Sequence, residues 1–404
     1  MKKISLLIAF ILVISCSKEQ TKILENGFYR VVLTVQDNEE LPFNMYVTSK
    51  NTLEIYNAEE VILVDEITYK NDSIFIQTPV FEGYIAAKIS ENGFTGNFII
   101  ESYDRIVSVK AEKNNKVRFP IQNEGETSSI NGVWETVFSK DSEEDRYIAK
   151  GVFEQNGNHI TGTFRTNTGD YRYLEGAIYG NKFQLSTFDG AHAFLFTGTI
   201  VDDKISGIFY SNIHWKEPFE GKRNPTFELP SSNDVTFLKE GYDKFNFSFP
   251  DQKGNLLTIE DSRFKGKVTV VQIMGSWCPN CLDETKYYTQ FLKENPTTEV
   301  EFIALAFEIS KTPDMAFKRI NRLQDRIGIK YPIVLAQYGS DSKLLANDKL
   351  PMLNKILSFP TSIFIDKKGK VRKIHTGFNG PATGQKYIDF KKEFEDFIEQ
   401  LLNE

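Results

Sequence analysis

The stretch Val268–Lys286 decides the fold; it reads VTVVQIMGSWCPNCLDETK. Its first part, Val268–Met274, is rich in β-branched apolar residues, which is typical of a strand buried on both faces. Cys278 and Cys281 follow with two residues between them, and Pro279 suits the first turn of a helix. The sequence therefore predicts a buried strand that leads into a helix beginning at the first cysteine.

This placement favours thiol chemistry at the two cysteines. At a helix N-terminus, unpaired backbone N–H groups and the positive end of the helix dipole stabilise a thiolate, which is the nucleophile of disulfide exchange. Cys281 lies one helical turn after Cys278, where it can attack a mixed disulfide formed at Cys278. We interpret the pair as a redox couple.

Two other interpretations of the pair are weaker. Tetrahedral zinc needs four ligands, and besides the pair the chain has only Cys16 and four scattered histidines. These are His159, His192, His214 and His375. The first three fall in strand or turn segments, where surface or packed histidines are more common than ligands. A purely structural disulfide would close a very short loop and stabilise little. We therefore expect no metal and no cofactor besides the cysteine pair.

Length and composition limit the classes of protein to which the chain can belong. Its 404 residues predict two or three domains. The net charge of −7 and the lack of a basic cluster argue against a nucleic-acid partner. Three cysteines in 404 residues cannot build a disulfide scaffold, so each cysteine needs its own explanation.

Residues 1–15 are expected to be an export signal. The apolar stretch Ile4–Ile14 follows two lysines and is too short for a bilayer span, which takes about 20 residues. The run LVISC ending at Cys16 resembles a bacterial lipoprotein signal. This resemblance implies cleavage before Cys16, lipidation of that cysteine, and a tether over 16–25. Because several acyl chains give stable attachment, we expect a membrane anchor; a plain secretory signal is the alternative.

Two β-rich segments, 26–116 and 131–223, look like copies of one unit. Each contains a strand with a central glycine, FTGNF from Phe94 and ISGIF from Ile205, offset by 205 − 94 = 111 residues. The alternating pattern predicts antiparallel meanders that form a curved sheet or small barrel in each copy. Neither copy shows a cluster of catalytic residues. Client binding, spacing from the membrane and dimerisation all stay open as roles.

The Pro/Ser/Asn-rich segment 224–236 is the predicted linker, and from 237 strands alternate with helices, as in an α/β sheet. We expect strands at 268–274, 300–307, 331–335, 358–366 and 371–375, and helices after the cysteine pair, at 313–327 and at the C-terminus. The predicted fold class is multi-domain. All-β duplicated meander or barrel-like units precede an α/β thioredoxin-like domain at 237–404.

Residues 237–404 resemble a TlpA/ResA-like thioredoxin domain. The matching motifs are WCPNC from Trp277, FPT from Phe359, and the hairpin from Ile365 to Lys370. The resemblance implies an exported, membrane-attached thiol–disulfide oxidoreductase. The family's central insertion accounts for the 360 − 281 = 79 steps from Cys281 to Pro360. A duplicated β half before such a domain resembles lipoproteins of Bacteroidetes-type bacteria.

The resemblance also implies roles for single residues. Cys278 would be the attacking thiolate and Cys281 the resolving thiol. Pro360 would be a cis-proline whose bend presents a backbone edge to a client peptide. Trp277 would flank the sulfurs. Glu284, three residues after Cys281, would relay a proton to it; a solvated helix residue is the alternative.

Three features of the sequence, two single residues and one dipeptide, depart from related proteins. Thioredoxin has a buried aspartate where this chain has Gln272, which cannot titrate, so proton transfer is left to Glu284 or water. Phe359 replaces a smaller residue before the cis-proline and is expected to narrow the client groove. The dipeptide Pro279-Asn280 lacks the histidine of strongly oxidising relatives, which predicts a reducing to intermediate potential.

These observations predict a lipoprotein facing the periplasm or cell surface. It would reduce or exchange disulfides in exported proteins, with electrons from a membrane thiol donor. The alternative is a β-rich binding or scaffold lipoprotein whose thioredoxin-like domain only docks clients. A peroxiredoxin-like peroxidase is weaker, because Gly275 occupies the place of the threonine that such enzymes need three residues before the reactive cysteine.

Overall fold

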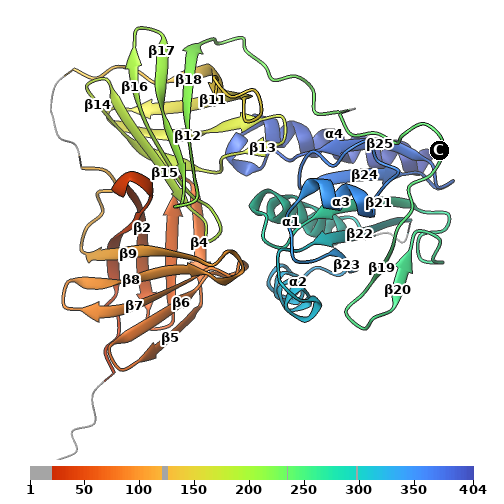
Figure 1. Ribbon diagram of the computed structural model, residues 1–404, viewed down its shortest axis with the longest axis horizontal. Helices are drawn as coiled ribbons and strands as arrows, with labels where there is room; N and C mark the ends of the chain where they lie inside the picture. Colours follow the sequence, from red (N-terminus) through yellow and green to blue (C-terminus); the bar gives the residue numbers. More distant parts are fainter. Residues whose placement is uncertain (1–20, 121–125, 234, 297–298) are drawn as a thin grey trace, which may run out of the picture.

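The computed structural model describes residues 21–120, 126–233, 235–296 and 299–404. Three lobes are visible in Figure 1: two β-rich units and one α/β domain. We call them unit 1 (strands β1 to β9), barrel 2 (strands β10 to β18) and the redox domain (β19 onward). The predicted signal at 1–15 and the lipidation site Cys16 lie outside the described residues.

Unit 1 is a nine-stranded antiparallel sheet with the order β4-β3-β2-β1-β9-β8-β7-β6-β5. Its strands are β1 (Gly27–Thr34), β2 (Glu40–Ser49), β3 (Thr52–Asn57), β4 (Glu60–Val64), β5 (Glu66–Lys70), β6 (Ser73–Gln77), β7 (Tyr84–Ser90), β8 (Gly93–Ile100) and β9 (Arg105–Lys113). Alternate residues of β3 are buried, as expected for a strand with one face on a core. Among the described strands, β4 and β5 each pair with one neighbour only, so the sheet is open between them.

Barrel 2 has the same meander closed into a ring. Its strands are β10 (Gly132–Phe138), β11 (Tyr147–Asn156), β12 (His159–Thr166), β13 (Gly169–Asp170), β14 (Leu174–Tyr179), β15 (Lys182–Phe188), β16 (Ala193–Val201), β17 (Lys204–Ser211) and β18 (Trp215–Arg223). The order is β11-β10-β18-β17-β16-β15-β14-β12-β13, and an additional β11–β12 pairing closes the ring. Large aromatic side chains fill the interior, among them Trp134, Phe138, Phe164, Phe183 and Phe196.

The two β units share a strand plan and differ at one place. Strands β6 to β9 and β1 to β3 correspond to β15 to β18 and β10 to β12. Gly96 and Gly207 occupy equivalent positions, and a Cβ atom on either would lie 2.1 Å from a carbonyl oxygen of the neighbouring strand. In barrel 2 the strand after β12 is only two residues long, so β14 pairs directly with β12. The predicted fold class of the N-terminal half is therefore confirmed.

The core of unit 1 is completed by the outer surface of barrel 2. Phe188 from β15 stacks on Phe43 with ring centroids 4.3 Å apart and meets the edge of Phe98 at 5.0 Å. Leu195 and Tyr210 of barrel 2 belong to the same buried cluster. The open sheet thus buries its apolar face against a neighbour instead of curling into a barrel of its own.

The redox domain is built on a five-stranded sheet with the order β23-β22-β21-β24-β25. Strands β21 (Val268–Met274), β22 (Val300–Phe307) and β23 (Ile333–Gln337) are parallel to one another. Strand β24 (Thr361–Ile365) is antiparallel to β21, and β25 (Val371–Thr376) is antiparallel to β24. The short hairpin β19 (Ser248–Pro250) and β20 (Leu256–Thr258) precedes them. Every residue of β21 is buried, as its composition predicts.

Among its described residues, the redox domain has four α-helices: α1 (Pro279–Glu294), α2 (Pro313–Ile327), α3 (Lys343–Lys349) and α4 (Gln385–Asn403). Tyr288 of α1 packs against Phe394 of α4 with ring centroids 5.2 Å apart, which places these two helices together. Helix α3 was not predicted, and it lies between β23 and Pro360. In the described residues, no helix is long and apolar enough to cross a bilayer.

Candidate active site

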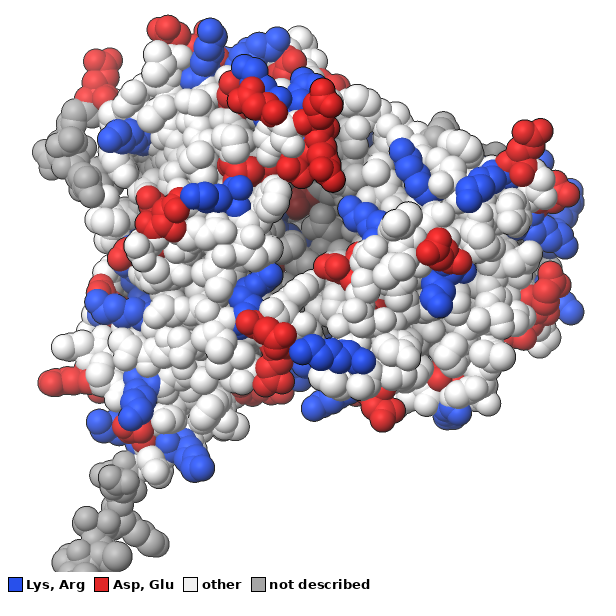
Figure 2. All heavy atoms as spheres, in the orientation of Figure 1, with Lys and Arg blue, Asp and Glu red and all other residues white. Residues whose placement is uncertain are grey.

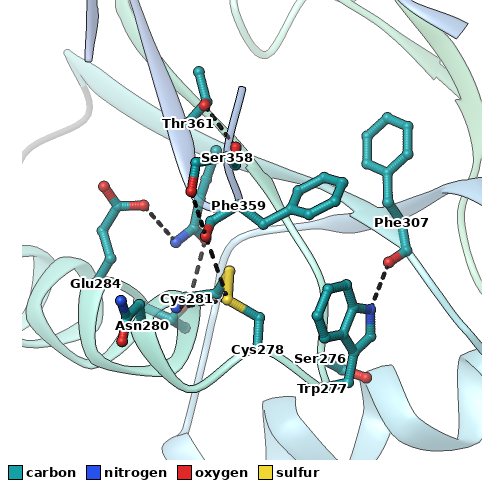
Figure 3. The surroundings of a disulfide bond; sticks show 12 residues. Ser276, Trp277, Cys278, Asn280, Cys281, Glu284, Phe307, Ser358, Phe359 and Thr361 are labelled. Carbon is teal, nitrogen blue, oxygen red and sulfur yellow. Dashed lines mark hydrogen bonds between the residues drawn. A yellow bond between two sulfur atoms is a disulfide. The ribbon is translucent and has the colours of Figure 1, made fainter. Parts of the chain in front are cut away.

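Cys278 and Cys281 form a disulfide at the start of α1, with Cα atoms 5.2 Å apart (Figure 3). Cys278 is the N-cap residue with extended backbone, and its Sγ accepts a hydrogen bond from the backbone N–H of Cys281 at 3.2 Å. Pro279 occupies the first turn, where its missing N–H costs no helical hydrogen bond. Cys278 is 7% exposed and Cys281 is fully buried, so Cys278 is the sulfur that a substrate reaches first.

The turn before the cysteines is held by β22. The Trp277 Nε1 donates to the carbonyl oxygen of Phe307 at 2.9 Å. The backbone N–H and the hydroxyl of Ser276 both donate to the carboxylate of Glu308, at 2.8 and 2.7 Å. Burial raises the pKa of Glu308 to about 7. This residue was not predicted from the sequence, where its only signal is an acidic side chain directly after an apolar strand.

Pro360 follows a cis peptide bond from Phe359, as the family resemblance implies. The Cys278 Sγ lies 3.6 Å from the carbonyl oxygen of Phe359. The rings of Phe359 and Trp277 meet edge to face with centroids 5.8 Å apart. Trp277 and Phe359 thus flank the Cys278 sulfur on two sides (Figure 3).

Glu284 is fully buried between α1 and the sheet, not solvated on the helix surface. Three neutral groups donate to its carboxylate: the Gln272 side-chain amide at 2.8 Å, the Tyr288 hydroxyl at 3.0 Å and the Ser362 hydroxyl at 3.1 Å. Burial raises the pKa of Glu284 to about 7, against the opposing effect of these hydrogen bonds. Gln272 therefore replaces thioredoxin's aspartate with a donor that holds the carboxylate.

A buried ion cluster joins the three lobes beside α1. Arg172 of barrel 2 forms ion pairs with Glu60 of unit 1 at 2.8 Å, with Asp189 at 3.3 Å, and with Asp283 of α1. The guanidinium side chain is only 3% exposed. Burial would raise the pKa of Asp189, but His192 and Arg172 beside it lower that pKa to about 2. The members lie far apart in sequence, and no local pattern links them.

Barrel 2 also touches the active-site face through the turn between β12 and β13. The Ser358 hydroxyl donates to the carbonyl oxygen of Thr168 at 3.2 Å. Gly169 forms a β-bridge with Phe378. Asp170 accepts a hydrogen bond from the backbone N–H of Gly380 at 2.6 Å. A β unit without a recognisable motif is thereby fixed next to the cysteine pair.

His192 and His214 line the same pocket, whereas His159 and His375 are not among its lining residues. His159 pairs with Glu175 at 3.1 Å, His192 with Asp189 at 3.4 Å, and His375 contacts Asn233 at 3.2 Å. His214 lies in the turn between β17 and β18. Within the part of the chain that the structure describes, no three or more His, Cys, Asp or Glu side chains are grouped as metal ligands.

The thioredoxin-type sheet, the cysteine pair at a helix N-terminus and the adjacent cis-proline define a thiol–disulfide oxidoreductase. Residues 221–387 match the Redoxin family. ResA of Bacillus thuringiensis subsp. konkukian is 30% identical over 134 residues, which are 33% of this chain and 68% of that protein. ResA of Bacillus subtilis is 29% identical over 141 residues, 35% of this chain and 69% of that protein. The chain belongs to this ResA-like family of thiol–disulfide oxidoreductases.

Among solved structures, a thiol:disulfide interchange protein from Chlorobium tepidum is 22% identical to this chain. The match covers 41% of this chain and 98% of the Chlorobium tepidum chain. Its TM-score of 0.29 is too low to add to the assignment. The family and the enzyme class expected from the sequence are confirmed by the sequence relatives.

Proposed function

We propose that the protein is a membrane-anchored oxidoreductase that reduces or exchanges disulfides in exported proteins. The observation that best supports this function is the difference in solvent exposure between the two sulfurs at the start of α1. Cys278 is 7% exposed and its Sγ lies 3.6 Å from the carbonyl oxygen of Phe359, whereas Cys281 is fully buried. This arrangement supports attack by Cys278 and resolution by Cys281.

In the proposed cycle, the Cys278 thiolate attacks one sulfur of the client disulfide. A Cys278–client disulfide forms, the client S–S bond breaks, and the departing client thiolate takes a proton. The Cys281 thiolate then attacks the Cys278 Sγ, which restores the Cys278–Cys281 disulfide and releases the second client sulfur as a thiol after protonation. Two electrons pass from the protein to the client. The Cys281 N–H and the helix N-terminus stabilise the Cys278 thiolate.

Glu284 is the proposed proton acceptor for Cys281. It follows Cys281 by one helical turn, and its pKa of about 7 allows it to gain or lose a proton near neutrality. Pro360 and the backbone of Phe359 form the proposed client edge next to the Cys278 sulfur. Trp277 is proposed to shield the sulfurs and to contact the client.

Export and anchoring are proposed from the sequence. The signal at 1–15 and lipidation at Cys16 would place the protein in the cell envelope, facing the periplasm or cell surface. Its partners would be disulfide-containing exported proteins and a membrane thiol donor, which has to return the disulfide to the dithiol for a reductase cycle. No cofactor besides the cysteine pair and no nucleic acid is part of this proposal.

Substitution of each cysteine tests the cycle. Cys278→Ser should abolish reduction of a model protein disulfide, because the attacking sulfur is lost. Cys281→Ser should accumulate a covalent client complex on non-reducing gels that dithiothreitol releases, because the resolving sulfur is lost. Wild-type activity in Cys278→Ser would contradict the proposal. So would a Cys278–Cys281 pair that stays oxidised in growing cells, measured by acid quenching and alkylation; that result favours the binding-module alternative.

A further inference from the structure

Cys278 opens onto a pocket of about 770 Å³ whose walls come from two lobes. The redox domain contributes Trp277, Cys278 and Phe359, and barrel 2 contributes the opposite wall. Figure 2 shows the molecular surface hollowed between the β units and the redox domain. A pocket of this volume is in the range that encloses a ligand of drug size, which is comparable to a few amino-acid residues. The reactive sulfur therefore faces barrel 2 and not open solvent alone.

Part of the barrel wall is aromatic, and the two tyrosine hydroxyls in this part bond within the wall. Phe194 and Phe209 are buried, and Tyr171 packs against them with centroids 5.5 and 5.1 Å away. The Tyr147 hydroxyl donates to Glu217 at 2.7 Å and is hydrogen-bonded to the Tyr171 hydroxyl. Because these polar groups bond to one another, the wall offers ring faces and edges to an incoming group. It suits an apolar or aromatic side chain.

A second pocket of about 370 Å³ continues the first one toward unit 1. The two pockets share Trp277, His192, Phe194, Ser211 and His214 among their lining residues. The far end of the second pocket is formed by Tyr103 and Arg105 of unit 1. A small disulfide would occupy only the part beside Cys278. An extended polypeptide would contact the full length of this groove, which therefore favours a peptide occupant.

We infer that this groove is the client-binding site and that it takes an extended polypeptide segment. The client cysteine would meet Cys278, and an apolar, preferably aromatic, residue beside it would contact Phe194 and Phe209. This inference rests on the proposed reductase function and gives barrel 2 a role that the sequence does not reveal. The β12–β13 turn already occupies the side of the site along the loop around Phe378. The client therefore reaches Cys278 through the groove.

Filling the groove tests the inference in the full-length protein. Ser211 on β17 is partly exposed and lines both pockets, so Ser211→Trp should fill the groove beside Phe194. Ser206→Trp is the matched control, because Ser206 is exposed on the same strand and is absent from both linings. The substrates are hydroxyethyl disulfide and two short disulfide peptides that differ only in Phe or Ser beside one cysteine.

Burial of one aromatic side chain should give the wild-type protein a kcat/KM roughly ten-fold higher for the Phe peptide than for the Ser peptide. Ser211→Trp should lose most of this preference and change reduction of hydroxyethyl disulfide by less than about two-fold, because the small substrate gains little from the aromatic wall. Ser206→Trp should behave like the wild-type protein. Equal rates for both peptides in the wild-type protein would overturn the inference, as would an equal loss for all three substrates in a folded Ser211→Trp protein.

Trp215→Ala provides a second variant if Ser211→Trp does not fold. Trp215 lies on the pocket wall and is 41% exposed, so its removal should spare the fold. It should lower the preference for the Phe peptide by roughly three-fold, since a partly exposed ring buries less area. An unchanged preference would overturn the inference. A wild-type protein that reduces none of the three substrates would overturn the reductase function itself, and the client site with it.

Discussion

Two buried carboxylates, Asp189 at the junction of the lobes and Glu284 on α1, have pKa values shifted in opposite directions. At the junction with the β units, Asp189 lies beside Arg172 and has its pKa lowered to about 2 despite burial. Between α1 and the sheet, Glu284 accepts hydrogen bonds from neutral donors only among the described residues, and burial raises its pKa to about 7. His192 and Arg172 lie beside Asp189, and both lower its pKa. The donors to Glu284 are neutral, and their hydrogen bonds do not offset burial. Contact with Arg172 alone does not set the direction, because burial raises the pKa of Glu60, which also pairs with Arg172.

Helix α1 joins these two environments within one turn. Asp283 contacts Arg172 of barrel 2, and the next residue, Glu284, is directed to Gln272 of β21. Neighbouring helical residues point about 100° apart, so adjacent acidic residues reach different partners. Cys281 lies two residues before Asp283 on the same helix. The ion pair to barrel 2 and the buried Glu284 are thus both carried by the helix that also carries the cysteines.

The largest expected effect comes from removing the junction cation. Arg172→Met leaves Asp189, Asp283 and Glu60 buried without their shared partner, which should cost about 3–5 kcal/mol of unfolding free energy. Arg326→Met is the matched control, because Arg326 pairs with Asp65 between partly exposed side chains and should cost less than about 1 kcal/mol. Urea unfolding followed by circular dichroism measures both. Equal losses would contradict the distinction between the junction and the surface.

A smaller effect is expected from Glu284→Gln, which replaces the carboxyl by a neutral group of the same shape. The folded-state pKa of Glu284, about 7, lies above the ordinary value of 4.5, so the folded protein binds this proton more tightly than the unfolded chain. The wild-type protein should therefore lose stability as pH rises from 4.5 to about 7, by roughly 3 kcal/mol for this group. The variant should lack that part of the slope.

Melting temperature against pH, with the oxidised protein, measures the slope. Burial raises the pKa of Glu308 in the same direction, so a slope from that residue should persist in Glu284→Gln. The matched control is Glu294→Gln on the exposed side of the same helix, which should leave the profile unchanged. Identical slopes in the wild-type protein and Glu284→Gln would show that folding does not raise the pKa of Glu284.

Local sequence patterns predict the strands and helices of the redox domain well, because nearby residues are enough to determine where these elements begin. An apolar run fixes β21, a proline fixes the first turn of α1, and the predicted helix at 313–327 matches α2. The partners of Glu284 could not be predicted in the same way. Gln272 and Ser362 lie 12 and 78 residues away, and each contact depends on how α1 lies on the sheet.

The junction is less predictable still, since its members come from three lobes. Arg172 and Asp283 are separated by 111 residues, and each looks like an ordinary surface charge in its own segment. The duplicated offset predicts two related β units. It does not predict that barrel 2 is closed and unit 1 is open. This difference depends on the length of the fourth strand, which is two residues in barrel 2 (β13) and five residues in unit 1 (β4). The groove above Cys278 arises only when barrel 2 is placed on the redox domain.

The smallest expected effect concerns the neutral donors around Glu284. Tyr288→Phe removes a hydroxyl that donates to Glu284 at 3.0 Å and lies 2.9 Å from the Ser362 hydroxyl, but it keeps the ring in the core. Loss of one such hydrogen bond should cost about 1 kcal/mol and raise the midpoint of the pH profile by roughly half a unit, because the charged carboxylate loses a donor. Tyr287→Phe is the control, since that hydroxyl bonds to Lys391 and Glu395 of α4 instead. If both variants leave the midpoint unchanged, the neutral donors do not set the pKa of Glu284. Burial alone would then account for the raised pKa of Glu284.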